Sequence, residues 1–216
     1  MVEGLKCATC GKVHQSLPRS FAADFPDVYA NMKREERDVR TIIGSDQCIV
    51  DQKWFFIRGC LEIPVPGSTE PFLWRLWASV REEVFDEISE SWEQKGRENV
   101  RGPFKGRLAN SLSLYPETLN LKVKILIQPI ATRPLFIVEQ LEHPLAVEQQ
   151  TGISEERACE IAGFFTRSDS MACRICLAFN RLFASSTPFP QQSRPCSIPL
   201  GPFHPHNHNR TSVRPQ

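Results

Sequence analysis

Two long apolar segments, separated by a proline-rich linker, constrain the fold more than any other feature of this sequence. Residues 54–63 alternate as a β-strand does, and residues 72–80 are apolar on both faces except at Arg75 and Ser79. One face of the first segment carries Phe55, Ile57, Leu61 and Ile63. The linker, residues 64–71, contains a Pro-Gly-Ser turn and predicts a long hairpin loop. We therefore expect two paired strands at the centre of a sheet.

The remaining periodic segments predict helices and further strands that follow one another in blocks. Helical patterns cover residues 33–43 and 82–95, and Ser154 is a suitable N-cap for a last helix. Strand patterns cover residues 119–127 and 134–140. Because the strands do not alternate regularly with helices, the fold is expected to be α+β, with a largely antiparallel sheet and flanking helices.

Composition divides the chain into a domain and a tail. The chain has 216 residues, 41% of them hydrophobic, enough for one well-packed core, which we place in a single domain over residues 1–166. After Asp169 no acidic residue follows, whereas five arginines and seven of the 17 prolines do. Residues 167–216 are therefore predicted to be a low-complexity tail, disordered from about residue 185 onward.

Charge and cysteine content indicate the compartment. The formal net charge is +1, so no general attraction to nucleic acid or to anionic membranes is expected. No apolar run approaches the ~18 residues that span a bilayer, and the first residues do not resemble a secretory signal. Eight cysteines in such a chain predict reduced thiols in the cytoplasm. The sequence leaves binding partners and oligomeric state open.

The segment Cys7-x2-Cys10-Gly11, followed by His14, has the residue types and spacing of half a zinc knuckle. Zinc binds thiolates and imidazoles in a tetrahedron, and a C-x2-C turn brings two sulfur atoms to one ion. Candidates for the fourth ligand are Cys48, Cys60 and His143, or water. The alternatives are a pair of reduced cysteines without metal, or a redox dithiol. We predict zinc bound by Cys7, Cys10, His14 and Cys48.

Two other groups of residues have both a functional and a structural interpretation. Cys48 could act as a nucleophile with His143 as its base, although a cysteine in this position is more often a small core residue. Arg58 and Glu62 share one strand face and could bind a ligand, although a cross-strand ion pair is the commoner arrangement. The structural interpretation is favoured in both cases.

Several segments in order resemble one bacterial protein family. They are Cys-x2-Cys-Gly-x2-His-x2-Leu-Pro (7–18), Glu-Arg-x2-Arg (36–40), Ser-Asp-Gln-Cys-Ile-Val-Asp (45–51), Phe-Phe-Ile-Arg-Gly-Cys-Leu-Glu-Ile-Pro (55–64), Tyr-Pro-x-Thr-Leu-Asn-Leu (115–121) and His-Pro-Leu-Ala-Val-Glu-Gln (143–149). The chain is identified, over roughly residues 5–166, as a member of the family called domain of unknown function 2199. The resemblance implies a bacterial domain without an assigned activity, cofactor or catalytic residue. Arg75 stands where the family usually has glycine.

Two function classes follow from these observations. The first is a non-catalytic cytosolic binding module whose N-terminal segment is stabilised by zinc. The second is an enzyme, either a metal-assisted hydrolase or a thiol-dependent enzyme, centred on His14, Cys48 or His143. The sequence contains no P-loop, no Gly-x-Ser-x-Gly and no His-Glu-x-x-His motif, which favours the binding module.

Overall fold

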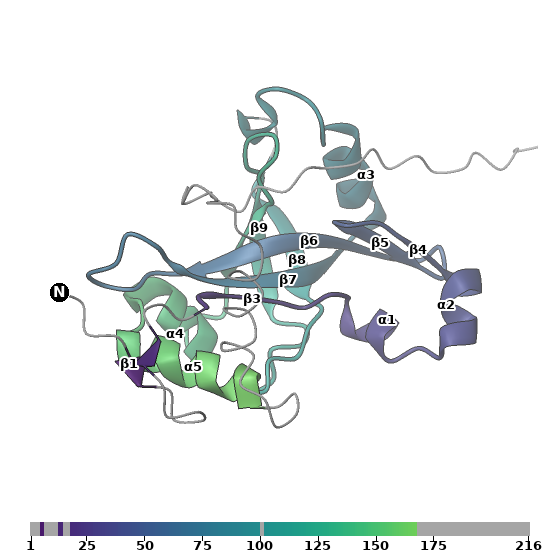
Figure 1. Cartoon of the computed structure of the whole chain (residues 1–216). Helices are drawn as coiled ribbons and strands as arrows, with labels where there is room; N and C mark the ends of the chain where they lie inside the picture. Colours follow the sequence, from purple (N-terminus) through teal and green to yellow (C-terminus); the bar gives the residue numbers. More distant parts are fainter. Residues whose placement is uncertain (1–4, 7–12, 15–17, 100–101, 168–216) are drawn as a thin grey trace, which may run out of the picture.

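The two long predicted strands form the centre of the structure (Figure 1). In the computed structural model, which describes residues 5–6, 13–14, 18–99 and 102–167, they are β6 (Trp54–Ile63) and β7 (Phe72–Val80). They pair antiparallel over nine positions and are joined by the predicted hairpin loop. The side chains of Phe55, Ile57, Leu61 and Ile63 all lie in the main core, as their alternation predicts.

Three shorter strands close this hairpin into a barrel. β8 (Phe104–Leu108) pairs with the C-terminal part of β7, and β9 (Lys122–Leu126) follows β8 antiparallel. β10 (Leu135–Val138) pairs antiparallel with β9 and then parallel with β6, where Leu135 lies opposite Cys60. The described part of the chain is therefore a mixed α+β fold built on a closed barrel, which the predicted antiparallel sheet did not anticipate.

Additional strands extend the barrel on either side. β3 (Ser20–Ala22) runs parallel to the N-terminal part of β7, while β5 (Gln47–Val50) and β4 (Thr41–Ile43) extend from β6. Near the N-terminus β1 (Leu5–Lys6) and β2 (Val13–His14) pair antiparallel as a separate two-stranded sheet.

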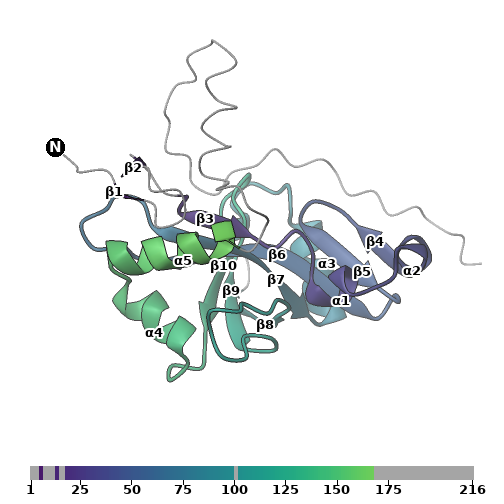
Figure 2. The same cartoon turned by 60° about the horizontal axis from the view of Figure 1, so that its bottom comes forward.

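Helices flank the sheet at its two ends (Figures 1 and 2). They are α1 (Asp27–Ala30), α2 (Arg34–Arg40), α3 (Glu82–Glu90), the short 3₁₀ helix η1 (Arg97–Asn99), α4 (Pro144–Thr151) and α5 (Glu155–Arg167). α4 and α5 lie beside each other near the β6–β7 loop, whereas α1 and α2 lie toward the opposite end. Of the helices in the described residues, none has the length and apolar character needed to cross a membrane.

The two faces of the β6–β7 hairpin bury different side chains. One face lies in the main core, whose largest fully buried side chains include Trp74, Phe72 and Phe136. The opposite face holds a smaller apolar cluster of Cys48, Val50, Phe56, Trp77 and Ala109. This second face, which is outside the main core, also carries the charged residues described below.

Several predicted boundaries are wrong. The helix expected over 33–43 ends at Arg40, and residues 41–43 instead form β4 against β5. The strand expected over 119–127 begins only at Lys122, and Leu119 is 44% exposed. β8 and α4 were not predicted at all. The predicted tail lies outside the described residues apart from Arg167.

Candidate functional site

The outer face of β6 carries a buried ion pair between Asp46 and Arg133. The Arg133 Nε–H donates to Asp46 Oδ1, and Ser45 Oγ donates to Asp46 Oδ2 over 2.7 Å. Asp46 is 3% exposed and Arg133 is 4% exposed. Arg133 Nη1 is buried without a hydrogen-bond partner. Removing two charges from water is expensive, and this pair leaves one guanidinium nitrogen uncompensated.

Arg58 lies beside this pair and is also incompletely bonded. Its backbone N–H donates to Asp46 O over 2.8 Å, and its Nη2 donates to Ala23 O over 2.8 Å. The guanidinium carbon lies 5.6 Å from the centre of the Trp77 ring, within the range of a cation–π contact. Arg58 Nε is buried without a partner, and the carboxylate of Asp24 is 3.9 Å from Arg58 Nη2 but 84% exposed.

Arg75 completes a group of three arginines, which we call the arginine cluster (Arg58, Arg75 and Arg133). Arg75 lies opposite Cys60 on β7, and its Nε–H donates to Ser20 Oγ over 2.8 Å. Burial lowers the pKa of Arg58 and of Arg75, and repulsion by neighbouring arginines lowers both further. Three guanidinium groups therefore converge on a face where Asp46 is the one buried carboxylate among the described residues.

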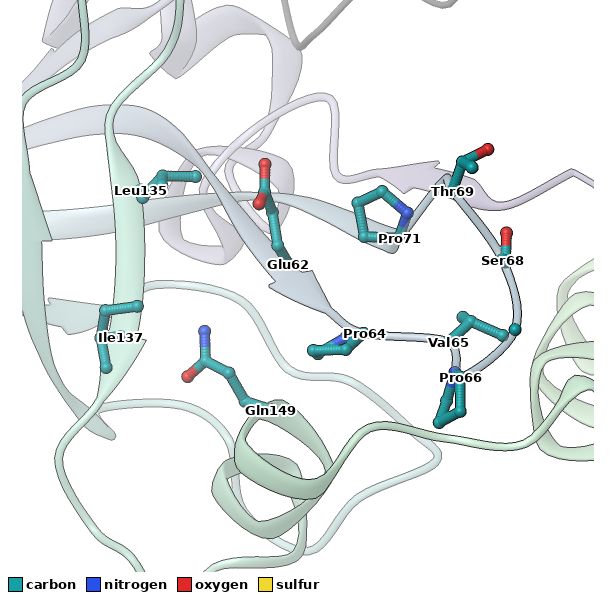
Figure 3. A pocket seen from close by; sticks show the side chains of 11 residues that line it. Glu62, Pro64, Val65, Pro66, Ser68, Thr69, Pro71, Leu135, Ile137 and Gln149 are labelled. Atoms are coloured by element: carbon teal, nitrogen blue, oxygen red, sulfur yellow. The ribbon is translucent and has the colours of Figure 1, made fainter.

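A pocket of about 480 Å³ opens at the other end of the same strand (Figure 3). It lies between the β6–β7 hairpin loop and β10, and Gln149 of α4 forms part of its wall. Most of its lining is aliphatic or proline: Pro64, Val65, Pro66, Pro71, Leu135 and Ile137. Its size is in the range of sites that accept small organic molecules.

Glu62 supplies the ionisable group of this pocket. Its side chain is half-buried, and burial raises the pKa of the carboxyl. Within the described residues no ion pair involves Glu62, so the favoured cross-strand ion pair is not formed at this residue. Gln149 has a structural function, because its Nε2 donates to Phe136 O over 2.7 Å and its Oε1 accepts from Val138 N over 2.9 Å. The Gln149 amide thus forms hydrogen bonds with backbone groups of β10 that a neighbouring strand would otherwise form.

The structure places Cys48 in the second apolar cluster. It lies on β5 with 0% exposure, packed with Val50, Phe56 and Trp77. Burial raises the pKa of its thiol to about 12, so the neutral thiol dominates at physiological pH. These surroundings match the favoured interpretation of Cys48 as a small core residue.

His143 caps a helix. As the N-cap residue of α4, its Nδ1 accepts from Leu145 N over 3.1 Å, and its Nε2 is 2.8 Å from Pro116 O. With Nδ1 as acceptor, Nε2 carries the proton and donates it to this carbonyl. Both ring nitrogens are thereby bonded to backbone, so the geometry does not support His143 as a base for Cys48.

The predicted zinc ligands near the N-terminus are only partly described. Cys7 and Cys10 lie outside the described residues, whereas the backbone of His14 belongs to β2. Among the residues that the structure does describe, no group of three or more His, Cys, Asp and Glu side chains is arranged to hold a metal ion. The zinc site therefore stays a prediction.

The segments that carry the family resemblance contact one another. Tyr115 Oη donates to Glu148, and the Pro116 carbonyl bonds His143, so segment 115–121 is fastened to segment 143–149. Elsewhere the Arg40 guanidinium donates twice to Asp51, at 2.7 Å each, although this pair is exposed. These contacts connect parts of the chain that are distant in sequence.

The sequence analysis predicted neither the role of Arg133 nor the burial of Asp46. A buried aspartate requires a cationic partner, but only the structure shows that Asp46 is buried. The requirement for a cationic partner also does not indicate which of the 26 basic residues fulfils it, because Arg133 is separated from Asp46 by 87 positions.

The comparisons with known proteins agree with the resemblance. A family model described as "Uncharacterized protein conserved in bacteria (DUF2199)" matches residues 6–153. No curated protein and no solved structure matches the chain significantly. Since the match spans more than half of the chain, including the arginine cluster and the pocket of Figure 3, the protein belongs to the bacterial family of domain of unknown function 2199.

Proposed function

We propose that the protein is a non-catalytic cytosolic binding module that holds a small ligand in the pocket beneath the β6–β7 loop. The observation that carries this proposal is the half-buried carboxyl of Glu62 in a pocket of about 480 Å³ with largely apolar walls. A few polar groups within an apolar concavity are characteristic of ligand sites.

The chemistry of the walls indicates the ligand class. Prolines and aliphatic side chains of the loop and of β10 accept an apolar body. Glu62 favours a hydrogen-bond donor, and an amine is the best match because a cation would offset the cost of burying the carboxylate. We infer a small ligand with an apolar body and a cationic amine.

Titration of the full-length protein with 2-phenylethylammonium, followed by NMR shifts of the pocket residues, tests this proposal. Saturable shifts are expected around the loop at neutral pH. Glu62→Gln should weaken binding about tenfold, the value of one charge-assisted hydrogen bond. Glu70→Gln is the matched control, because Glu70 lies on the same loop outside the pocket lining.

Two results would count against this function. One is the absence of saturable shifts in the pocket. The other is equal binding of 2-phenylethylammonium by the wild type and by Glu62→Gln, which would remove the carboxyl from recognition.

We also propose that zinc stabilises the N-terminal segment through Cys7, Cys10 and His14. The pairing of β1 with β2 supports this, because Leu5 lies opposite His14 and Lys6 opposite Val13. The antiparallel pair joins the two ends of segment 7–12, and a C-x2-C turn within such a hairpin suits a tetrahedral zinc ion. For the fourth ligand we propose water, because Cys48 is fully buried in the second apolar cluster.

Zinc content of the full-length protein, measured by native mass spectrometry, tests this second proposal. One zinc per chain is expected in the wild type, and Cys10→Ser should lose it. Cys48→Ser should retain the zinc, and loss of zinc in this variant would instead assign Cys48 as the fourth ligand. Protein purified in reducing buffer without chelator and free of metal would contradict the zinc site.

A further inference from the structure

We propose that the arginine cluster binds a doubly charged oxyanion of phosphate type on the outer face of β6 and β7. This site is separate from the pocket of Figure 3, and it does not depend on the function proposed above. Nothing in the family description assigns an anion to this domain.

The register of the strands brings the three arginines together. On β6, Arg58 and Cys60 face the same side, and Arg75 lies opposite Cys60 on β7. Arg133 reaches the same place from the other edge of β6, because Pro134 O accepts the Cys60 N–H over 2.8 Å. The three arginines therefore surround one strand position from both sides.

Two guanidinium groups of the cluster have unused hydrogen-bond donors. Arg58 Nε and Arg133 Nη1 are buried polar atoms without a hydrogen-bond partner in the part of the chain that the structure describes. A buried donor that is left unbonded costs about 1–3 kcal/mol, and more when it is charged. Two such atoms on neighbouring guanidinium groups are readily explained if an external acceptor binds both.

Positive charge exceeds negative charge in the arginine cluster. Three guanidinium groups share one buried carboxylate, Asp46, which already accepts from Arg133 and Ser45. The remaining nearby carboxylate, Asp24, is 84% exposed, so solvent screens its effect. An excess of two buried or half-buried positive charges matches a dianion better than a single carboxylate.

The arginine cluster is partly exposed on the side of Arg58 and Arg75. Arg133 is nearly enclosed, whereas the Arg58 side chain is 14% exposed and Arg75 is half-buried, so a ligand can approach from their side. Planar guanidinium groups donate paired N–H bonds, which fit the oxygens of a phosphate group. Either free inorganic phosphate or the phosphate of a small metabolite would satisfy this chemistry.

Calorimetric titration of the full-length protein with inorganic phosphate tests the site, at constant ionic strength maintained with sodium chloride. Saturable binding is expected, together with a rise of the melting temperature that grows with phosphate concentration. Acetate at the same concentrations should bind at least tenfold more weakly, because one negative charge leaves part of the cluster uncompensated. A phosphorylated metabolite that binds more tightly than phosphate would show that the natural ligand is larger.

Substitution of Arg75 provides the variant test, because Arg133→Gln would leave Asp46 buried without its partner. Arg75→Gln should weaken phosphate binding about tenfold, and Arg75→Lys should weaken it less, since a point charge remains. Arg81→Gln is the matched control, because Arg81 is exposed at the start of α3.

The proposal is overturned if the wild type shows no saturable phosphate binding beyond chloride, or if acetate binds equally well. It is also overturned if Arg75→Gln folds and binds phosphate as the wild type does. The two wild-type titrations decide the question even if the Arg75 variants fail to fold.

Discussion

Substitution of Gly59 by alanine probes the closure of the barrel. A Cβ atom at position 59 would lie 2.4 Å from Cε1 and from Cζ of Phe136, and 2.7 Å from Pro134 O. Carbon atoms in contact are normally about 3.5–4.0 Å apart, so each ring atom would need to move by more than about 1 Å. Glycine at this position thus permits the close approach of β10 to β6.

Neither the Phe136 ring nor the Pro134 carbonyl can move away from Gly59 without a loss of stability. The Phe136 ring is 0% exposed within the main core, and Pro134 O accepts the Cys60 N–H over 2.8 Å. Overpacking of a close-packed core costs about 1–3 kcal/mol, and a clash with backbone places Gly59→Ala at the upper end. We expect a loss of about 3 kcal/mol in the free energy of unfolding.

Urea denaturation of the full-length protein measures this loss, and a double-mutant cycle with Phe136→Ala tests its cause. Truncation of the ring makes room for the new methyl group, so the double variant should be more stable than additivity predicts by about 1 kcal/mol or more. Gly67→Ala is a control, because a Cβ there meets nothing within 4 Å and costs only the strain of a positive φ. A Gly59→Ala cost below about 0.5 kcal/mol, or strict additivity with Phe136→Ala, would refute the reasoning.

Three further predictions concern buried polar groups. Glu62→Gln should raise the free energy of unfolding at pH 7 by less than about 1 kcal/mol, because the pKa of the half-exposed Glu62 carboxyl is raised in the folded state. Urea titrations at several pH values should show that this gain vanishes once the pH falls below the pKa that the Glu62 carboxyl has in the unfolded state. Iodoacetamide at pH 8 should alkylate Cys48 at least about a hundredfold more slowly in the folded than in the unfolded protein, because burial raises the pKa of the thiol to about 12. Equal alkylation rates, measured by peptide mass spectrometry, would contradict this. Asn110→Ala should lower the free energy of unfolding, measured in urea, by about 3 kcal/mol, because Asn110 Oδ1 accepts the buried Trp77 N–H over 2.8 Å and Asn110 Nδ2 donates to Phe25 O and Asp27 Oδ1. A loss under about 1 kcal/mol would mean that water replaces these bonds.

Strong local patterns predicted the centre of the fold correctly. The bounds of β6 and β7 agree with the alternation of residues 54–63 and with the segment 72–80 that is apolar on both faces. The proline-rich linker between them is the hairpin loop. Ser154 is also confirmed as a cap, because its Oγ accepts from Arg157 N over 3.2 Å at the start of α5. In these places the local sequence alone determines the structure.

Long-range contacts explain where the predictions were wrong. Residues 41–43 continue a helical pattern, yet pairing with β5 makes them a strand, because tertiary contacts outweigh local propensity. β8 contains Lys105 and Arg107, so it lacks the apolar run by which a strand is recognised, and its place is set by β7 and β9. The closure of β10 onto β6 depends on a glycine contact that no periodicity reveals.

The same limit applies to the candidate sites. Arg58, Glu62 and Cys48 were singled out from the sequence, but the partners of Arg58 come from residues 23–24 and β7. The surroundings of Glu62 come from the β6–β7 loop, β10 and α4. The arginine cluster needs Arg133, which becomes a neighbour of Arg58 only after the barrel closes. The sequence thus predicts which side chains share one face of a strand, but it does not predict which side chains from other elements approach that face.

The contact between Tyr115 and Glu148 has a consequence for how relatives of this protein diverge. The Tyr115 hydroxyl donates to Glu148 across 33 positions, and Arg157 also donates to Glu148 over 2.9 Å. Loss of the tyrosine hydroxyl in a relative would leave the carboxylate with one partner fewer in a partly buried place. Substitutions at these positions should therefore occur together in the family, and their covariation would trace the packing of α4 against the loop that precedes β9.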